Sequence, residues 1–188
     1  MSSNASRVTS AAATRVWDRT VRLVHWGLVL LVVAAWFTKE LRGPTHQWLG
    51  YGAAALVALR VVWGFTGGRR ARFAQFFSAP AATWTYSRAV LAGHAPRYLG
   101  HNPLGGWMVL ALLVTLGALC LSGWLFTTDW LWGYAWLENT HAVLGWLLVG
   151  FATLHVAGVA FTSWHQRENL VRAMIDGHKR AAAPGDEG

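Results

Sequence analysis

Charge is scarce in this sequence, and acidic charge is the scarcest. Of the 188 residues only 13% are charged, against roughly 25% in soluble domains. The 16 Lys and Arg outnumber the 8 Asp and Glu, and hydrophobic residues make up 54% of the chain. Cysteine occurs once, as Cys120, which excludes an internal disulfide and a cysteine-ligated iron–sulfur cluster. So few charges could not solvate a soluble protein of this size, which indicates a membrane protein.

The chain contains long segments with little or no charge. Four segments carry at most one Asp, Glu, Lys or Arg, namely 23–38, 47–68, 98–128 and 139–166. A transmembrane helix needs about 20 predominantly apolar residues. We therefore predict an all-α integral membrane protein, a four-helix transmembrane bundle with helices at about 17–38, 45–66, 103–127 and 138–163. A large soluble helical core is the alternative.

The remaining segments suggest how the chain is divided and oriented. We predict a disordered tail at 1–14, a four-helix domain at 15–166 and an amphipathic tail at 167–188, with a short interfacial helix that includes Ser78, Pro80 and Trp84–Leu91 in the loop 69–100. Lys and Arg concentrate before the first helix, in that loop and in the last segment. The positive-inside rule then places both termini and the loop in the cytoplasm. Anionic lipid headgroups suit these charges, and the pI near 10.8 is therefore weak evidence for nucleic acid.

Four histidines fall within or at the ends of the apolar segments: His25, His46, His141 and His155. An ionisable side chain at that depth is costly and suggests a function. His141 and His155 are 14 residues apart, which puts them on nearly one helix face and about 21 Å apart. Depth in the bilayer pairs His46 with His141 near the outer side and His25 with His155 near the inner side. The other histidines in loops and helix ends, His94, His165 and His178, read as surface residues.

Two stacked histidine pairs match the axial ligands of two haems. Haem supplies four equatorial nitrogens and needs only axial ligands, whereas zinc or copper would want further Cys, His or carboxylate ligands. The absence of a C-x-x-C-H motif excludes covalent c-type attachment, so we expect two non-covalent b-type haems, each with two histidine ligands. The alternative is that these histidines only form hydrogen bonds between helices.

The chain resembles the bacterial cytochrome b561 family, which includes the b-type cytochrome subunit of nickel–iron hydrogenases. The shared motifs, in order, are Arg22-x-x-His25-Trp26, His46-x-x-x-Gly50-Tyr51, Arg60-x-x-Trp63-Gly64-Phe65, Gly100-His101-Asn102-Pro103-Leu104-Gly105-Gly106 and Glu168-Asn169-Leu170-x-x-Ala173-Met174-Ile175-x-Gly177-x-Lys179. The resemblance covers almost the whole chain after residue 15. It implies a di-haem electron carrier of the bacterial cytoplasmic membrane, with ligands from the first, second and fourth helices.

The resemblance also implies a function in a respiratory chain. Family members pass electrons between the quinone pool, ubiquinone or menaquinone, and a redox partner such as a hydrogenase or a soluble cytochrome. The chain is shorter than the hydrogenase subunits, which favours a partner other than a hydrogenase. A stand-alone redox enzyme coupling a small diffusible species to quinone is the alternative, with Lys39 and Arg42 as a cationic patch near His46. A third hypothesis is a haem-free proton or ion transporter that uses the histidines as a relay.

Four further residues are candidates for binding the cofactors. Arg22 lies one turn before His25, and Arg60 lies 14 residues after His46, or about 21 Å deeper. Each could pair with a haem propionate or reach the inner headgroups. His101 and Asn102 lie at the predicted inner interface, where they could hydrogen bond a quinone headgroup. Asn102 could instead cap the helix that begins at Pro103.

Overall fold

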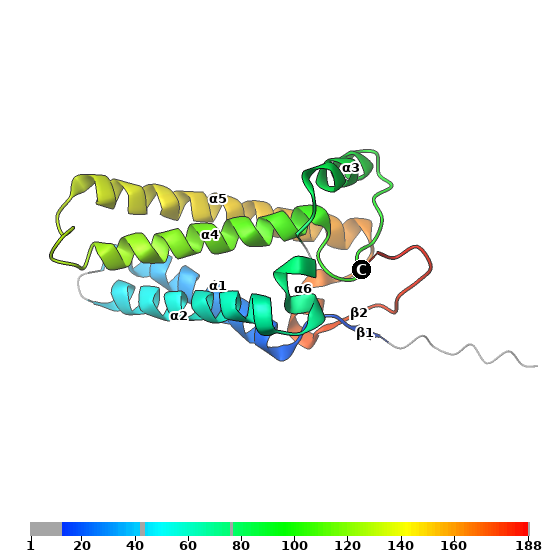
Figure 1. Ribbon diagram of the computed structural model, residues 1–188, viewed down its shortest axis with the longest axis horizontal. Coiled ribbons are helices and arrows are strands. Elements are labelled where there is room, and N and C mark those ends of the chain that lie inside the picture. Colours follow the sequence, from blue (N-terminus) through cyan, green and yellow to red (C-terminus); the bar gives the residue numbers. More distant parts are fainter. Residues whose placement is uncertain (1–12, 42–43, 76, 188) are drawn as a thin grey trace, which may run out of the picture.

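Four long helices lie side by side as a bundle in the computed structural model, which describes residues 13–41, 44–75 and 77–187 (Figure 1). They are α1 (Arg19–Thr38), α2 (Thr45–Thr66), α4 (Pro103–Leu125) and α5 (Ala135–His165). All four are long and apolar enough to cross a membrane, which confirms the predicted count for the described residues. The last helix is longer than predicted and begins at Ala135 rather than near 138.

Polar side chains and prolines set the helix ends. The Asp18 carboxylate accepts a hydrogen bond from the Val21 amide at 2.8 Å and so caps α1. The Asn102 side chain accepts one from the Gly105 amide at 2.7 Å and caps α4, whose first residue is Pro103. Capping, one of the two readings of Asn102, is thus present in the fold.

The bundle is apolar outside as well as inside. Val57, Leu116 and Leu148 form a buried cluster between α2, α4 and α5. Many large side chains face outward instead, including Leu30 and Val114, which are 70% and 71% exposed. Water would disfavour such a surface and lipid would not. The chain is a multi-pass membrane protein.

The remaining elements gather at one end of the bundle (Figure 1). They are β1 (Thr14–Arg15), η1 (Arg69–Ala71), η2 (Phe73–Gln75), α3 (Pro80–Leu91), α6 (Leu170–Asp176) and β2 (His178–Lys179). The strand β1 pairs antiparallel with β2, so the two ends of the described chain meet here. Of the predicted tail 1–14, residues 1–12 lie outside the described residues, and Thr14 belongs to β1. The segment expected to hold a short helix, with Ser78, Pro80 and Trp84–Leu91, contains α3; its position at the membrane interface stays a prediction.

A glycine makes the turn between α6 and β2. Gly177 has φ +88°, a left-handed conformation that suits glycine at the end of a helix. Its carbonyl accepts hydrogen bonds from the amides of Val16 and Trp17 at 2.8 and 3.1 Å. A Cβ at this position would lie 2.7 Å from the Trp17 carbonyl oxygen, so a larger residue would push the two segments apart. This turn therefore fixes the C-terminal segment against the start of α1.

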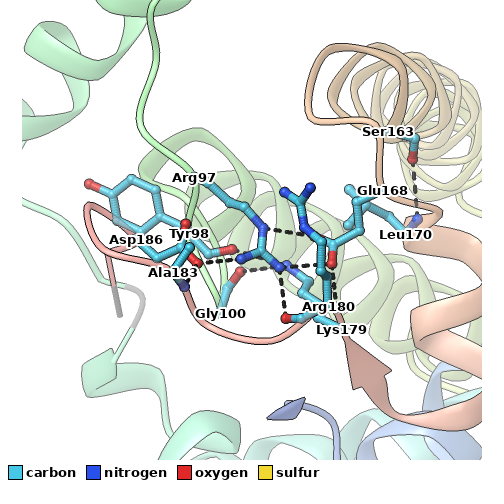
Figure 2. A network of polar contacts seen from close by, with 10 residues as sticks. All are labelled: Arg97, Tyr98, Gly100, Ser163, Glu168, Leu170, Lys179, Arg180, Ala183 and Asp186. Carbon is cyan, nitrogen blue, oxygen red and sulfur yellow. Dashed lines mark hydrogen bonds and ion pairs between the residues drawn. The ribbon is translucent and has the colours of Figure 1, made fainter. Parts of the chain in front are cut away.

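Buried ion pairs bind the C-terminal segment to the loop before α4. The Arg97 guanidinium contacts the carboxylates of Glu168 and Asp186, and it also donates to the Arg180 carbonyl at 3.0 Å (Figure 2). The Glu168 carboxylate accepts from Arg97 Nη2 at 2.8 Å and from the Arg180 amide at 2.7 Å. Burial alone would raise the pKa of Glu168, but these hydrogen bonds and the charge of Arg97 hold it below the usual range. Three segments distant in sequence thus share one network, which we call the Arg97 network.

Candidate functional site

The outer histidine pair joins the beginning of α2 to the beginning of α5. His46 lies in the first turn of α2 and His141 in the second turn of α5, and their ring centroids are 6.1 Å apart. The two helices begin at the same end of the bundle, opposite the gathered loop elements. The structure therefore brings together one of the two pairs predicted from depth.

The inner pair joins α1 to the same helix α5. The rings of His25 and His155 have centroids 6.3 Å apart. The His25 ring also lies 5.1 Å from the Trp26 ring, whose indole N–H donates to the Met174 carbonyl at 3.2 Å. The second predicted pair is thus brought together as well, near α6.

The spacing of both pairs fits a metal ion held between two imidazoles. Two metal–nitrogen bonds of about 2 Å each, placed in line, leave ring centres about 6 Å apart. Both measured separations, 6.1 and 6.3 Å, match that span. Haem fits this donor set because its macrocycle fills the equatorial positions and leaves two axial ones. Zinc would require two more protein ligands at each pair.

Hydrogen bonds fix which ring nitrogen of the outer pair can bind a metal. His46 Nδ1 lies 2.9 Å from the Ala35 carbonyl oxygen, which can only accept, so Nδ1 carries the hydrogen. His141 Nδ1 lies 3.0 Å from the Ser122 hydroxyl. In both residues Nε2 keeps its lone pair for a ligand. The sequence could not reveal Ala35 or Ser122, because an alanine carbonyl and a helical serine carry no signal of this contact.

Arg60 is held at the inner end of α2. Its side chain is buried, with the residue 6% exposed. Its Nη2 donates to the Ala71 carbonyl at 3.2 Å, and its guanidinium carbon lies 5.1 Å from the centre of the Phe73 ring. Its charge therefore stays near the inner end of the bundle and does not extend to open solvent.

Arg22 contacts α6. Its Nη1 donates to the Ile175 carbonyl, and its Nε lies beside Gly177. This contact ties α1 to α6 one turn before His25. Of the two predicted propionate partners, Arg60 is the more deeply buried.

His101 is enclosed at the inner end, against the Trp17 ring at 4.7 Å between centroids. Burial, followed by the positive charges of Lys179 and Arg60, lowers the pKa of His101 to about 3. His101 is therefore neutral at physiological pH.

Lys179, which the sequence motifs contain without indicating a role, is a further buried cation. It is 6% exposed, and its Nζ donates to the Tyr98 carbonyl at 3.1 Å and the Gly100 carbonyl at 3.4 Å. Burial lowers its pKa to about 8, so it remains mostly charged at neutral pH. It gathers with Arg60 and His101 around the inner end, a position that depends on the pairing of β1 with β2.

At the outer end, Lys39 has local partners. Its Nζ lies 3.8 Å from a Glu40 carboxylate oxygen and 4.2 Å from the centre of the Trp36 ring. Arg42, the other member of the predicted cationic patch, lies outside the described residues. The Glu40 carboxylate therefore offsets part of the charge of Lys39.

The fold and the paired histidines define a class of protein: a multi-pass helical membrane protein with two pairs of facing histidines between its long helices. The model of one family, prokaryotic cytochrome b561, matches residues 16–177. The chain belongs to this family, which confirms the resemblance inferred from its motifs. Membership implies haem b and electron transfer in a membrane.

Curated relatives agree with the family. A probable Ni/Fe-hydrogenase B-type cytochrome subunit of Rhodobacter capsulatus is 26% identical, with 87% of this chain and 80% of that protein covered. A protein of the same name from Cupriavidus necator is 24% identical, with 90% and 88% covered. No solved structure matches the chain. The first match spans 213 aligned positions but only 87% of this 188-residue chain, so the relative has insertions, which agrees with the expectation that this chain is shorter. That it serves a partner other than a hydrogenase stays a prediction.

Proposed function

We propose that this protein is a di-haem b-type cytochrome that carries electrons between the membrane quinone pool and a redox partner in a respiratory chain. The observation that carries the proposal is the pair of facing histidine rings at each end of the bundle, 6.1 and 6.3 Å apart. One metal-ligating pair could be a packing coincidence. Two pairs that share α5 and have the same spacing support two sites of one kind.

His46 and His141 would hold the outer haem, and His25 and His155 the inner one. Bound there, haem b supplies an iron centre that exchanges single electrons. With two histidines on each iron no position stays open for substrate, which favours outer-sphere electron transfer over oxygenation. The protein's part is to orient the ligands, exclude water and place charges that set the potentials.

Buried cations at the inner end support propionate binding there. A propionate is an anion that needs a cationic or hydrogen-bonding partner inside a low-dielectric site. Arg60 is the main candidate, Lys179 is a further one, and Arg22 is a third that would have to share its contact with α6. His101 and Asn102 remain candidates for a ubiquinone or menaquinone headgroup, although Asn102 already uses its side-chain oxygen to cap α4.

The redox partner would dock at the outer end of the bundle, beside His46 and His141. The names of the relatives make a hydrogenase of the nickel–iron type a candidate, and a soluble cytochrome is another. We place the protein in the bacterial cytoplasmic membrane, with both termini and the loop 69–100 in the cytoplasm. The gathering of the arginine-rich segments at one end supports this orientation.

Haem counting on purified protein tests the proposal. A reduced-minus-oxidised absorbance spectrum should show b-type haem, and a pyridine haemochrome assay should give two haems per chain. One haem per chain in undenatured protein would contradict the di-haem assignment. A colourless protein would refute it altogether and favour the proton-relay reading.

A further inference from the structure

The hydroxyl of Ser122 lies against the outer pair and belongs to α4, the one long helix that carries none of the four paired histidines. Ser122 is 5% exposed, and its Oγ lies 3.0 Å from His141 Nδ1 and 2.9 Å from the Leu119 carbonyl oxygen. A serine inside an apolar helix ordinarily bonds to its own backbone. Here the same oxygen also reaches a neighbouring helix.

The direction of the two hydrogen bonds follows from the groups involved. The hydroxyl has one hydrogen, and the Leu119 carbonyl can only accept it. The Ser122 oxygen then accepts a second bond, from Nδ1–H of His141. The hydrogen of the imidazole is thereby held on Nδ1, and Nε2 keeps its lone pair.

The residue after Ser122 allows the close approach. A Cβ at Gly123 would lie 3.0 Å from His141 Cε1 and 3.5 Å from its Nδ1. The His141 ring therefore rests on the backbone of α4, where a side chain would displace it. Ser122 and Gly123 together set the position of the ring, the first by a hydrogen bond and the second by the space it leaves.

We propose that Ser122 is a positioning residue that fixes the tautomer of His141 and strengthens its Nε2 as a ligand, which lowers the potential of the outer haem. The inference rests on the proposed function. A histidine that donates its second N–H to an acceptor becomes a more basic ligand, and a more basic ligand favours ferric over ferrous iron. His46 has a similar acceptor in the Ala35 carbonyl, but a backbone group cannot be removed by substitution. Ser122 is therefore the side chain through which the effect can be measured.

The test compares three variants of the full-length purified protein. Ser122→Ala removes the hydroxyl acceptor and leaves the Leu119 carbonyl as the other hydrogen-bonding group near His141, and Ser122→Thr retains a hydroxyl. Thr115→Ala, two turns earlier on α4, removes another buried hydroxyl as a matched control. Each variant is assayed for haem per chain, by redox titration of both haems and by the EPR signal of the ferric outer haem.

Ser122→Ala should shift the ferric–ferrous equilibrium of the outer haem by up to about tenfold, which is about 59 mV upward for one electron. The inner haem should keep its potential, and Ser122→Thr and Thr115→Ala should resemble the wild type. Loss of the outer haem from Ser122→Ala alone, with Ser122→Thr intact, would also support the positioning role.

Two results would overturn it. One is an unchanged outer potential and EPR signal in Ser122→Ala with both haems bound. The other is equal loss of haem from all three variants, which would reduce Ser122 to a packing residue. A wild-type protein without haem would instead refute the proposed function, so the two failures are distinguishable.

Discussion

At the scale of single residues, each histidine pair is formed by side chains from two different helices. His46 and His141 come from different helices, and so do His25 and His155. The helix α5 contributes one histidine to each pair, and its geometry places His141 and His155 about 21 Å apart along its axis. This arrangement makes the ligand assignment testable one residue at a time.

Replacing either member of a pair should remove the same haem. His46→Ala or His141→Ala should abolish the outer component in a redox titration, and His25→Ala or His155→Ala the inner one, because each change removes one of the two ligands proposed for that haem. His165→Ala is the control, since His165 is exposed at the end of α5 and stacks on Phe161. Loss of the same component from His46→Ala and His155→Ala would show that the pairing is wrong.

Arg60→Leu should lower the potential of the inner haem. If Arg60 pairs with a propionate of the inner haem as proposed, loss of this cation would leave that propionate unpaired, and an unpaired negative charge near iron favours the ferric form. We expect a fall on the order of 59 mV, which is tenfold for one electron, with little change at the outer haem. Arg60→Lys retains the charge and serves as the control. An unchanged inner potential with both haems bound would mean that Arg60 serves only its contacts with Ala71 and Phe73.

At the scale of elements, the sequence predicts the helices well and the contacts of the inner end poorly. Long apolar runs need a helix in lipid, because each backbone polar group must be satisfied within the segment. This is why α1 and α2 end at the predicted Thr38 and Thr66. The strands β1 and β2 have two residues each, and no periodic pattern can reveal so short a pair.

Much of the site geometry likewise could not be predicted from the sequence. The pairing of histidines follows from depth, because depth depends only on position along a helix. The contact of Ser122 with His141 depends on how α4 is rotated against α5, which an apolar helix with little amphipathic pattern does not reveal. Lys179 reaches the inner end only through β2, so its burial is also a tertiary effect.

Among the inner-end contacts, the Arg97 network should be the most sensitive to substitution. Arg97→Met would leave the Glu168 carboxylate buried without its cation, which costs about 3–5 kcal/mol for such pairs. The segment 180–187 should then detach and be cleaved faster by trypsin in detergent-purified protein. The double variant Arg97→Met with Glu168→Gln should be cleaved more slowly than Arg97→Met alone. Equal cleavage rates for wild type and Arg97→Met would rule out this role.

Acid should release the same segment. The pKa of Glu168 is lowered in the fold, so its stabilising contribution is complete above its ordinary value of 4.5 and is lost as pH falls through the lower folded value. The protection of residues 180–187 against hydrogen exchange, taken relative to the intrinsic rate at each pH, should therefore fall below pH 4.5 in the wild type. In Arg97→Met this protection should already be low at neutral pH and change little with acid.

At the scale of the whole molecule, the positively charged side chains lie mostly at one end of the bundle. The described arginines before α1, in the loop 69–100 and after α5 lie at the end that holds β1, α3 and α6. The opposite end carries Lys39 with its neighbour Glu40, and the turn between α4 and α5 adds Asp129. Because translocation leaves Lys and Arg in the cytoplasm, this asymmetry predicts one orientation.

Cysteine labelling tests that orientation. In a Cys120→Ala background, Ala182→Cys should resist a membrane-impermeant thiol reagent in right-side-out vesicles and react after the vesicles are opened. Asp129→Cys, at the opposite end, should react in both. Labelling of Ala182→Cys in sealed vesicles would reverse the assigned topology.

The pairing of residues 14–15 with 178–179 has a consequence for the order of assembly. Contacts so distant in sequence carry a large loop-closure cost and form late. Both histidine pairs also take one member from α5, so each lacks a ligand until that helix enters the membrane. During synthesis α1, α2 and α4 would enter the membrane first and form an incomplete bundle until α5 joins them. Completion of both histidine pairs, and closure of the inner end over them, would then follow the entry of α5 into the membrane.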